Sequence, residues 1–167
     1  MFKKNAHCSY CGGAFEEEQP WPRRCATCGN TSYVNPTPVA VVLLPIDGGL
    51  LMVRRSIAPH IGKLALPGGY VNLGETWQEA GARELLEETG IAIDPQELCE
   101  FRVLSAPEGM ILIFGLARPR SQAELPSFQP TVEVSECLVG GPDEEIAFEL
   151  HRQVAAEFFS GSRAPIV

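Results

Sequence analysis

The sequence predicts an α/β domain preceded by a small cysteine-rich module, in a chain of 167 residues. Three observations favour this fold class. Four of the six cysteines lie before residue 36, where turn-forming residues are frequent and apolar periodicity is weak. Short apolar runs of strand length follow, and they alternate with segments predicted to be helical. A chain of this length has room for one ordinary domain and one small module.

The boundary between the two parts is expected at Asn35-Pro36-Thr37-Pro38. Two prolines within three residues restrict the backbone and are typical of a short, stiff connection. We therefore expect a module of residues 1–35 and a larger domain of residues 36–167.

The first element expected in the larger domain is a β-hairpin. Two apolar runs, Val39–Leu44 and Leu50–Val53, flank the turn formers Asp47-Gly48-Gly49. Pro107-Glu108-Gly109 is expected to form a second turn, between two later strands. The later runs that predict strands are Leu64–Leu66, Val103–Ser105, Met110–Ala117 and Thr131–Val139.

Two helices are expected. Glu75–Thr89 contains no proline and only one glycine, Gly81, and Gly90 follows it as a typical helix stop. Glu144–Phe159 carries apolar residues at helical spacing, which predicts an amphipathic helix that closes the chain. The segment Pro119–Pro130 is expected to be an exposed loop.

Composition and charge exclude several classes of function. Hydrophobic residues make up 45% of the chain and charged residues 20%, so the chain can bury a core. The net charge of −8 disfavours general nucleic-acid binding and docking on an anionic membrane. No apolar run approaches the ~20 residues of a membrane span. The basic start, Met1–Cys8, lacks the apolar stretch of a secretory signal, so we expect a cytoplasmic protein with reduced thiols.

The first strong motif is a pair of Cys-x2-Cys units. Cys8 and Cys11 form one unit, Cys25 and Cys28 form the other, and a glycine follows each. Two thiolates at this spacing can point at one ion, and two units give the tetrahedral four-sulfur set that structural zinc prefers. A module of this size buries little core, so metal binding would supply its folding energy.

This module resembles a zinc ribbon. An iron–sulfur or rubredoxin-like iron site uses the same ligand type and remains an alternative, whereas disulfides fit poorly with a chain that lacks a secretion signal. The other two cysteines, Cys99 and Cys137, have no partner pattern and are expected to be buried apolar thiols.

The second strong motif is a cluster of glutamates in the first predicted helix. Glu84, Glu87 and Glu88 are spaced i, i+3 and i+4, so they share one helical face within a single turn. Carboxylates this close repel one another, and Mg²⁺ or Mn²⁺, which prefer oxygen ligands, would relieve that repulsion. Arg83 brings a positive charge that can anchor a neighbouring glutamate. A solvated surface helix is the alternative interpretation of the three glutamates alone.

The surrounding residues favour the cation site because they match the Nudix box without departure. The box reads Gly-x5-Glu-x7-Arg-Glu-U-x-Glu-Glu-x-Gly-U, where U is aliphatic. Its fixed positions here are Gly69, Glu75, Arg83, Glu84, Leu85, Glu87, Glu88, Gly90 and Ile91. The chain is therefore similar to Nudix hydrolases over residues 36–165. The resemblance implies an α/β/α sandwich with a mixed sheet, and hydrolysis of a nucleoside diphosphate linked to another group.

The resemblance also implies roles for the residues of the box. Glu84, Glu87 and Glu88 would bind the catalytic Mg²⁺ or Mn²⁺, and the Gly69 carbonyl would add a ligand. Glu75 would support the loop or the metal-bound waters. A metal ion neutralises pyrophosphate oxygens and makes its bound water a better nucleophile at neutral pH.

Residues outside the box complete the predicted site. A carboxylate from a late strand is expected to act as base or further ligand, with Glu133 as the first candidate and Glu136 as the second. His60, Lys63 and Gly68 precede or open the glycine loop and are candidates for binding substrate phosphates. A surface-strand glutamate and ordinary loop residues are the alternative interpretations of these positions.

The combination of ribbon and box bears on the substrate. It is similar to the NADH pyrophosphatases, but their Ser-Gln-Pro-Trp-Pro-Phe-Pro signature after the box is missing. The layout more closely resembles a ribbon-bearing Nudix group that includes plant enzymes acting on FAD and ADP-ribose. Pro107 also lies sixteen positions past Ile91, where ADP-ribose pyrophosphatases carry a proline.

We therefore expect a Mg²⁺- or Mn²⁺-dependent enzyme that hydrolyses ADP-ribose, or a dinucleotide such as FAD, to AMP and the other half. Alternatives are an NADH or NAD pyrophosphatase, a triphosphate or RNA-end hydrolase, and a non-catalytic nucleotide sensor whose ribbon binds a partner. A small nucleotide derivative is the expected partner, without membrane or extended nucleic acid, and a homodimer is compatible with the resemblance.

Overall fold

The computed structural model describes residues 4–107 and 109–161 and divides into two compact units, Met1–Pro36 and Thr37–Val167. Glu108, in the middle of a predicted turn, lies outside the described residues. No helix within the described part of the chain is long and apolar enough to cross a membrane.

The first unit is a small cysteine-rich fold. Its strands β1 (Arg23–Arg24) and β2 (Thr31–Ser32) pair in antiparallel orientation. Within residues 4–36, the buried side chains are Cys8, Cys25 and Ser32, so this part of the unit has almost no apolar core.

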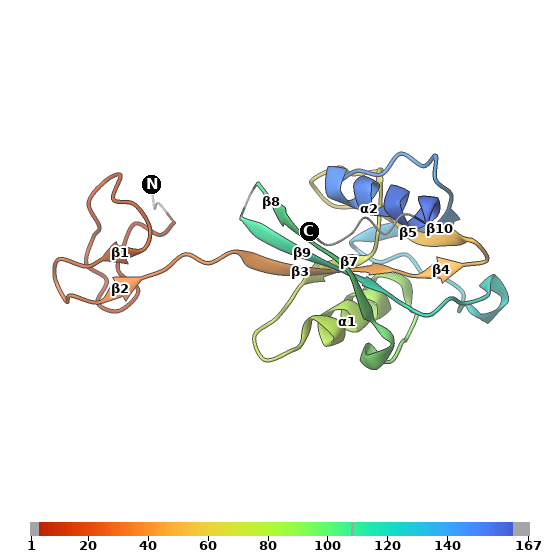
Figure 1. The fold of residues 1–167 in the computed structure, drawn as a ribbon, viewed down its shortest axis with the longest axis horizontal. Coiled ribbons are helices and arrows are strands. Elements are labelled where there is room, and N and C mark those ends of the chain that lie inside the picture. Colours follow the sequence, from red (N-terminus) through yellow and green to blue (C-terminus); the bar gives the residue numbers. More distant parts are fainter. Residues whose placement is uncertain (1–3, 108, 162–167) are drawn as a thin grey trace. The chain divides into compact units, whose positions relative to one another are not determined.

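The second unit contains a mixed four-stranded sheet (Figure 1). Its strands are β3 (Thr37–Leu43), β7 (Gly68–Tyr70), β8 (Cys99–Ala106) and β9 (Met110–Leu116), in the order β7-β3-β9-β8. Strand β3 is parallel to β9 and antiparallel to β7, and β8 is antiparallel to β9.

A second four-stranded sheet lies in the same unit. It is built from β4 (Pro45–Ile46), β5 (Gly49–Arg55), β6 (Leu64–Ala65) and β10 (Val134–Gly140), and its strand pairs are antiparallel. Strand β5 is central because it pairs with each of the other three.

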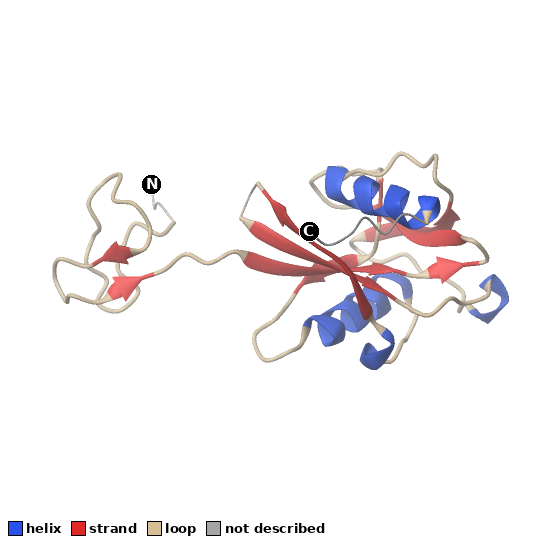
Figure 2. Cartoon of the chain, in the orientation of Figure 1, coloured by secondary structure: helices blue, strands red, loops and turns tan. Residues whose placement is uncertain are grey.

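Two α-helices flank the sheets, α1 (Trp77–Thr89) on one side and α2 (Glu149–Ser160) on the other (Figures 1 and 2). Short 3-10 helices, at Pro95–Glu97 and Gln122–Glu124, occur in connections. The predicted α/β class with mixed strands and flanking helices is confirmed. The predicted stop of α1 is also confirmed, because Gly90 ends it with φ 76° in the left-handed region.

The core lies on both faces of β3. Val41 and Leu43 belong to a cluster that includes Val154 of α2, whereas Val42 packs in a second cluster with Leu85 of α1. Side chains alternate between the two faces of a strand, so a strand covered on both sides is apolar throughout. This double burial explains the continuous apolar run in the sequence.

The predicted hairpin is wrong in its first strand. Pro45 and Ile46 pair with the start of β5, while β3 belongs to the other sheet. The long apolar run therefore crosses from one sheet to the other at Leu44–Pro45. The proline N lacks a hydrogen and cannot continue a ladder, which makes this position suitable for the crossing.

Several other boundaries differ from prediction: β8 begins at Cys99, four residues before the predicted Val103, and α1 begins at Trp77, two residues after the predicted Glu75. Gly68–Tyr70, predicted as loop, forms strand β7, because the glycines allow its backbone close to β3. Helix α2 begins five residues later than predicted, because the Ala147 N–H donates to the Leu64 carbonyl and holds the preceding segment extended. Strand β10 begins at Val134, because the Thr131 hydroxyl accepts the Val134 N–H in a turn.

Candidate metal centre and substrate cleft

The carboxylates of α1 meet the glycine pair of β7. A Cβ atom at Gly69 would overlap the Glu84 carboxylate, and one at Gly68 would overlap the Ala40 carbonyl in β3. The Gly68 N–H donates to Oε2 of Glu88 at 3.0 Å. Glycine is thus required at Gly68, where a side chain would meet backbone, whereas a side chain at Gly69 would displace the Glu84 carboxylate.

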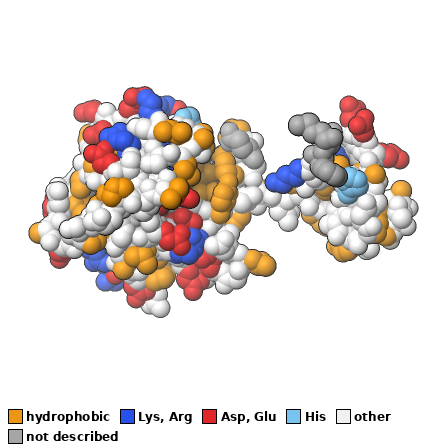
Figure 3. All heavy atoms as spheres, turned by 180° about the vertical axis from the view of Figure 1, so that it is seen from behind, with side chains coloured by type: hydrophobic (Ala, Val, Ile, Leu, Met, Phe, Trp, Pro, Cys, Tyr) orange, Lys and Arg blue, Asp and Glu red, His pale blue; other side chains and the backbone are white. Residues whose placement is uncertain are grey.

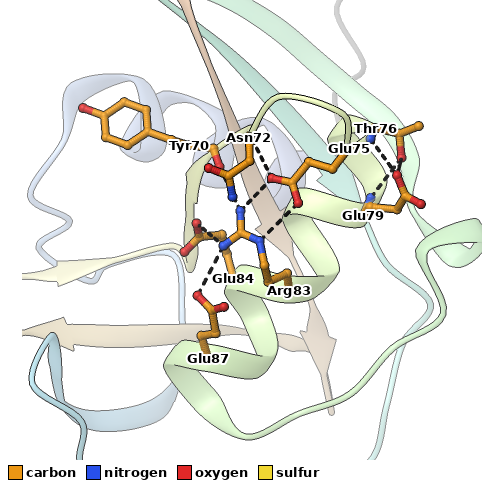
Figure 4. A network of polar contacts seen from close by, with 8 residues as sticks. All are labelled: Tyr70, Asn72, Glu75, Thr76, Glu79, Arg83, Glu84 and Glu87. Atoms are coloured by element: carbon orange, nitrogen blue, oxygen red, sulfur yellow. Dashed lines mark hydrogen bonds and ion pairs between the residues drawn. The ribbon is translucent and has the colours of Figure 1, made fainter.

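Arg83 organises the carboxylates beside these glycines (Figure 4). Its Nε and Nη2 donate to the two oxygens of Glu75 at 3.2 and 2.8 Å. Its Nη1 donates to Glu84 at 2.7 Å and to Glu87 at 3.2 Å, and its Nη2 also donates to the Tyr70 carbonyl at 2.9 Å. The planar guanidinium therefore links the loop, the helix and the strand through one side chain.

The first turn of α1 is fixed by a capping box. The Thr76 hydroxyl accepts the Glu79 N–H, and the Glu79 carboxylate accepts the Thr76 N–H at 2.7 Å (Figure 4). This cap sets where the helix begins. It thereby sets which glutamates face the glycine strand about two and three turns after Thr76.

The electrostatic environments of the carboxylates differ. Hydrogen bonds from Arg83 and the Asn72 N–H lower the pKa of Glu75 to about 2. Burial raises the pKa of Glu88 to about 7; the Gly68 N–H opposes this rise, and the charges of Glu84 and Glu133 add to it. Burial also raises the pKa of Glu84. A bound divalent cation would favour the ionised forms of both carboxylates, the half-buried Glu84 and the buried Glu88.

A cleft of about 1060 Å³ opens beside these carboxylates. Figure 3 shows acidic side chains next to a hollow with a hydrophobic surface on this side of the second unit. The sequence-predicted site residues that line the cleft are His60, Gly68, Gly69, Glu84, Glu87, Glu88 and Glu133. Predicted residues from four separate segments of the chain therefore converge on one concavity.

Two predicted candidates lie elsewhere. Lys63 is not among the cleft-lining residues and forms an ion pair with Glu145. Glu136 forms an ion pair with Arg54 at 2.6 Å on neighbouring strands. Of the two late glutamates, the structure brings only Glu133 to the cleft.

The three box glutamates do not converge on a single point. Among the residues that the structure describes, only the cysteine set brings three or more ligand atoms within 4.8 Å of one another. Glu84 and Glu87 share the Arg83 guanidinium, while Glu88 is held by Gly68.

Sequence reasoning missed Arg55, Phe148 and His151, which also line the cleft. The Arg55 guanidinium lies 5.1 Å from the centroid of the Phe148 ring, and the rings of His60 and Phe148 meet edge to face at 5.1 Å. Arg55 ends β5, His60 lies in the loop that follows it, Phe148 directly precedes α2, and His151 lies in the first turn of α2. No local motif connects positions so far apart, so no sequence signal was available for this group.

His151 is a buried neutral histidine of the cleft. Its Nδ1 accepts the Leu66 N–H at 3.3 Å, and its ring packs against Phe114 and Phe148. Burial, helped by the charge of Arg55, lowers the pKa of His151 from 6.5 to about 3. The hydrogen bond from the Leu66 N–H to His151 holds the segment that leads into strand β7.

This environment predicts an acid-dependent loss of stability. The unfolded state gains a proton on His151 below about pH 6.5, whereas the folded state resists protonation down to about pH 3. Stability from this group is therefore complete above pH 6.5 and declines toward pH 3. Urea unfolding of wild type and His151→Asn at pH 7.5 and 5 should show the steeper decline in wild type. Equal declines would contradict the prediction.

A second prediction concerns Arg83→Lys. Lysine keeps the charge but cannot hold Glu75, Glu84 and the Tyr70 carbonyl together, so the free energy of unfolding should fall by about 1–3 kcal/mol. Arg54→Lys, at a half-exposed arginine that pairs with Glu136 and donates to the Gly62 carbonyl, should cost less than about 1 kcal/mol. Equal small losses in urea unfolding of the two variants would contradict an organising role for Arg83.

The four cysteines of the first unit form a separate cluster. Sγ of Cys8 lies 3.7 Å from Sγ of Cys28, Sγ of Cys11 lies 3.6 Å from Sγ of Cys25, and all four are free thiols. Gly12 and Gly29 adopt φ 74° after the two Cys-x2-Cys units.

Backbone amides face the sulfurs of this cluster. Hydrogen bonds from the backbone N–H groups of Tyr10 and Cys11 lower the pKa of Cys8 to about 6. The thiolate form, which binds metals, is thereby favoured. The prediction of two further buried thiols is wrong for Cys99, which is exposed at the edge strand β8; Cys137 is half-buried, and burial raises its pKa to about 11.

Comparison with known proteins identifies relatives of this chain. The NUDIX domain family model matches residues 35–147. The chain is 27% identical over 115 residues to the NAD-capped RNA hydrolase NudC of Edwardsiella ictaluri, which covers 68% of this chain and 44% of that protein. It is 29% identical over 94 residues to the NAD-capped RNA hydrolase NudC of Shigella flexneri, and this alignment covers 56% of this chain and 36% of that protein. The chain thus spans less than half the length of these curated relatives.

Solved structures show the same fold. A NUDIX hydrolase from Nitrosomonas europaea aligns with a TM-score of 0.74 and 28% identity, covering 92% of this chain and 90% of the other. A bifunctional NMN adenylyltransferase/ADP ribose pyrophosphatase from Francisella tularensis, complexed with AMP and a manganese ion, aligns with a TM-score of 0.63 and 25% identity. The alignment covers 77% of this chain and 42% of that one.

Proposed function

The chain belongs to the Nudix family, and we propose that it is a divalent-metal-dependent pyrophosphohydrolase of small nucleotide derivatives. The observation that carries the proposal is the meeting of the α1 carboxylates with the side-chain-free backbone of Gly68 and Gly69 at the mouth of a large cleft. A carboxylate set open to a cleft offers the oxygen ligands that Mg²⁺ and Mn²⁺ prefer.

The residues present fit a divalent cation. Glu84, Glu87 and Glu88 would hold it, and the close approach of Glu84 to Gly69 places the Gly69 backbone beside the same oxygens. The acidic groups of this region outnumber its two arginines, Arg55 and Arg83, so a cation would offset their repulsion. When bound, the metal supplies charge neutralisation for the pyrophosphate and lowers the pKa of a bound water.

The chain's own residues orient the carboxylates, supply a base and bind the substrate. Arg83 and Glu75 fix the orientation of the carboxylates, and the Gly68 N–H holds Glu88 in place. Glu133, which lines the cleft and whose charge acts on Glu84 and Glu88, is the proposed base that accepts a proton from the attacking water. Arg55 and His60 supply positive or hydrogen-bonding groups for phosphate oxygens.

The proposed substrate is ADP-ribose or a dinucleotide such as FAD, cleaved to AMP and the remaining half. The similarity to a protein named as an ADP ribose pyrophosphatase supports this choice. NAD or NADH is the second candidate, and the similarity to proteins named NAD-capped RNA hydrolases favours it. A cleft of about 1060 Å³ has room for the larger members of this group.

We propose zinc for the cysteine cluster. Four thiols within 4.8 Å of one another suit a tetrahedral four-sulfur site, and the adjoining amide donors stabilise thiolates. Iron remains the alternative ion for the same ligand set. Free thiols of this kind are maintained in a reducing compartment, which is consistent with the expected cytoplasmic location.

A substrate panel tests the proposal. The full chain is incubated with ADP-ribose, FAD, NADH, NAD or a nucleoside triphosphate, with Mg²⁺ or Mn²⁺, and products are separated by chromatography. We expect AMP from the preferred substrate and none after addition of a chelator. Comparable slow turnover of every compound would contradict a preference for dinucleotides, and turnover unaffected by chelation would contradict the metal requirement.

A further inference from the structure

One aromatic ring in the wall of the cleft contacts three of the polar side chains that line it. The centroid of the Phe148 ring lies 5.1 Å from the Arg55 guanidinium and 5.1 Å from the centroid of the His60 ring. The His151 ring packs against the same ring at 5.0 Å between centroids. All four residues line the cleft, so Phe148 joins three segments of the chain at the candidate site.

The backbone on both sides of Phe148 is fixed by hydrogen bonds. The Ala147 N–H donates to the Leu64 carbonyl at 2.7 Å, and the Phe148 carbonyl accepts the Arg152 N–H at 3.0 Å. Phe148 is the N-cap residue of α2, a position where short polar side chains usually bond the first amides, and no side chain caps this helix. The helix thus lacks its usual cap, and the contacts of the Phe148 ring are the compensating feature of this position.

The ring holds Arg55 without using the groups that bind phosphate. The Arg55 Nε donates to the Pro59 carbonyl at 2.8 Å, and no acceptor within residues 4–107 and 109–161 bonds its two Nη groups. An aromatic face attracts the charge of a guanidinium without accepting its N–H donors, whereas a carboxylate partner would occupy them. The Arg55 side chain is therefore oriented while its donors stay available to a ligand.

His60 is held in a comparable way. Its ring meets the Phe148 ring edge to face, at an angle of 90°, and neither imidazole nitrogen is bonded to another described residue. Its carbonyl accepts the Lys63 N–H at 3.1 Å, which fixes the turn from which the ring projects. The imidazole is thus placed at the cleft with both of its hydrogen-bonding groups free.

The charge of Arg55 is important because it is rare in this cleft. Among the described residues that line the cleft, Arg55 is the one arginine or lysine. Burial is the main influence on the pKa of Glu88 and raises it, but the charge of Arg55 lowers it. The guanidinium therefore acts on the carboxylates, and a phosphate that binds beside them with its cation comes within reach of the same charge.

We propose that Phe148 is a positioning residue for substrate binding, which orients Arg55 and His60 toward the phosphate oxygens of the substrate. This proposal rests on the proposed function, because that function brings the phosphates to the carboxylates. The ring orders two side chains before the substrate arrives, so less side-chain freedom is lost on binding. Its loss should therefore weaken substrate affinity and raise KM, while kcat changes little because the carboxylates are untouched.

The experiment compares Phe148→Leu, which removes the aromatic face, with Phe148→Tyr, which keeps it. Phe148 is half-exposed, so leucine at this position leaves the core in place. Affinity is measured by calorimetry with the full chain in Mg²⁺ and α,β-methylene-ADP, which contains the ADP portion of ADP-ribose, FAD, NAD and NADH but cannot be cleaved between its phosphates.

Phe148→Leu should bind this probe about 2- to 30-fold more weakly than wild type, which is the range expected for a cation–π contact. Its KM for the preferred substrate should rise by a similar factor, with kcat within about twofold of wild type. Phe148→Tyr should bind the probe like wild type. Unchanged affinity in Phe148→Leu, an equal loss in Phe148→Tyr, or a wild type that does not bind the probe would overturn the proposal.

A double-mutant cycle tests whether Phe148 acts through Arg55. In an Arg55→Met background, Phe148→Leu should weaken binding by a smaller factor than in wild type, because one of the side chains that it positions is gone. Equal factors in the two backgrounds would contradict the positioning role.

Phe158→Leu is the matched control, since Phe158 is a half-buried ring of the same helix that packs against Phe159 and does not line the cleft. It should leave the affinity for the probe unchanged, and a loss equal to that of Phe148→Leu would show a general effect of helix stability and overturn the proposal. A wild type that binds the probe through Phe148 but hydrolyses no substrate would contradict only the proposed function.

Discussion

Glu88→Gln should reduce turnover by more than about 100-fold while the fold is retained. Loss of a residue that only hydrogen-bonds to a metal ligand lowers metal affinity or activity about 10- to 100-fold. Loss of a carboxylate that itself binds the cation should therefore lower activity by more than that. The amide oxygen can still accept the Gly68 N–H, which is the hydrogen bond that holds this side chain. Steady-state hydrolysis of the preferred substrate, with circular dichroism as the measure of folding, checks this prediction.

Glu145→Gln is the matched control for this charge removal. Glu145 is exposed, pairs with Lys63 and does not line the cleft. Its variant should retain turnover within about twofold, in keeping with the small contribution of exposed ion pairs. Undiminished hydrolysis by Glu88→Gln would refute the proposed metal site.

Cys25→Ser should unfold the first unit and abolish its metal content. Cys25 and Cys8 are among the few buried side chains in residues 4–36, the described part of this unit, so its apolar core contributes little stability. Binding of structural zinc to small four-ligand modules supplies about 10–16 kcal/mol, which exceeds what so small a core can offer. Metal analysis should give one zinc per wild-type chain and none for the variant, and limited proteolysis should cleave the variant within residues 1–36.

Cys99→Ser controls for the loss of a thiol. Cys99 is an exposed, unpaired cysteine of the second unit, outside the cluster. We expect its metal content and protease resistance to equal those of wild type. A Cys25→Ser protein that keeps full zinc and stays resistant would show that the cluster is not the metal site. If metal analysis finds iron in place of zinc, the identity of the ion is corrected, and the proposal that the four cysteines bind it is kept.

Features encoded within a few residues were accessible from the sequence. The spacing of Glu84, Glu87 and Glu88 follows from the period of one helix, and Gly90 ends that helix as predicted. The two Cys-x2-Cys units likewise determine local geometry. These patterns were sufficient for the fold class, for the position of α1 and for the proximity of the four thiols. The catalytic roles of the glutamates stay predictions.

Features that depend on long-range pairing were not accessible. Glu133 and Glu136 look equivalent in sequence, and only the pairing of β10 with β5 separates the cleft-lining glutamate from the one that pairs with Arg54. The contact of Arg55 with Phe148 joins β5 to the entry of α2. The sequence also could not show that the chain crosses between sheets at Leu44–Pro45. The residues before and after this point are buried, so the apolar run looks the same whichever sheet each half joins.

The loop between Tyr70 and Glu75 has its two ends fixed by one side chain. Arg83 binds the Tyr70 carbonyl and the Glu75 carboxylate, whereas Leu73 at the tip is fully exposed. The Asn72 N–H also donates to the Glu75 carboxylate, and the Glu75 N–H donates to the Asn72 carbonyl, so bonds within the loop fix its length as well. Leu73 makes none of these bonds, so its side chain can be exchanged while the carboxylates keep their places. New surface contacts can therefore be acquired at this tip by substitution, in evolution or by engineering, whereas an insertion would displace Glu75.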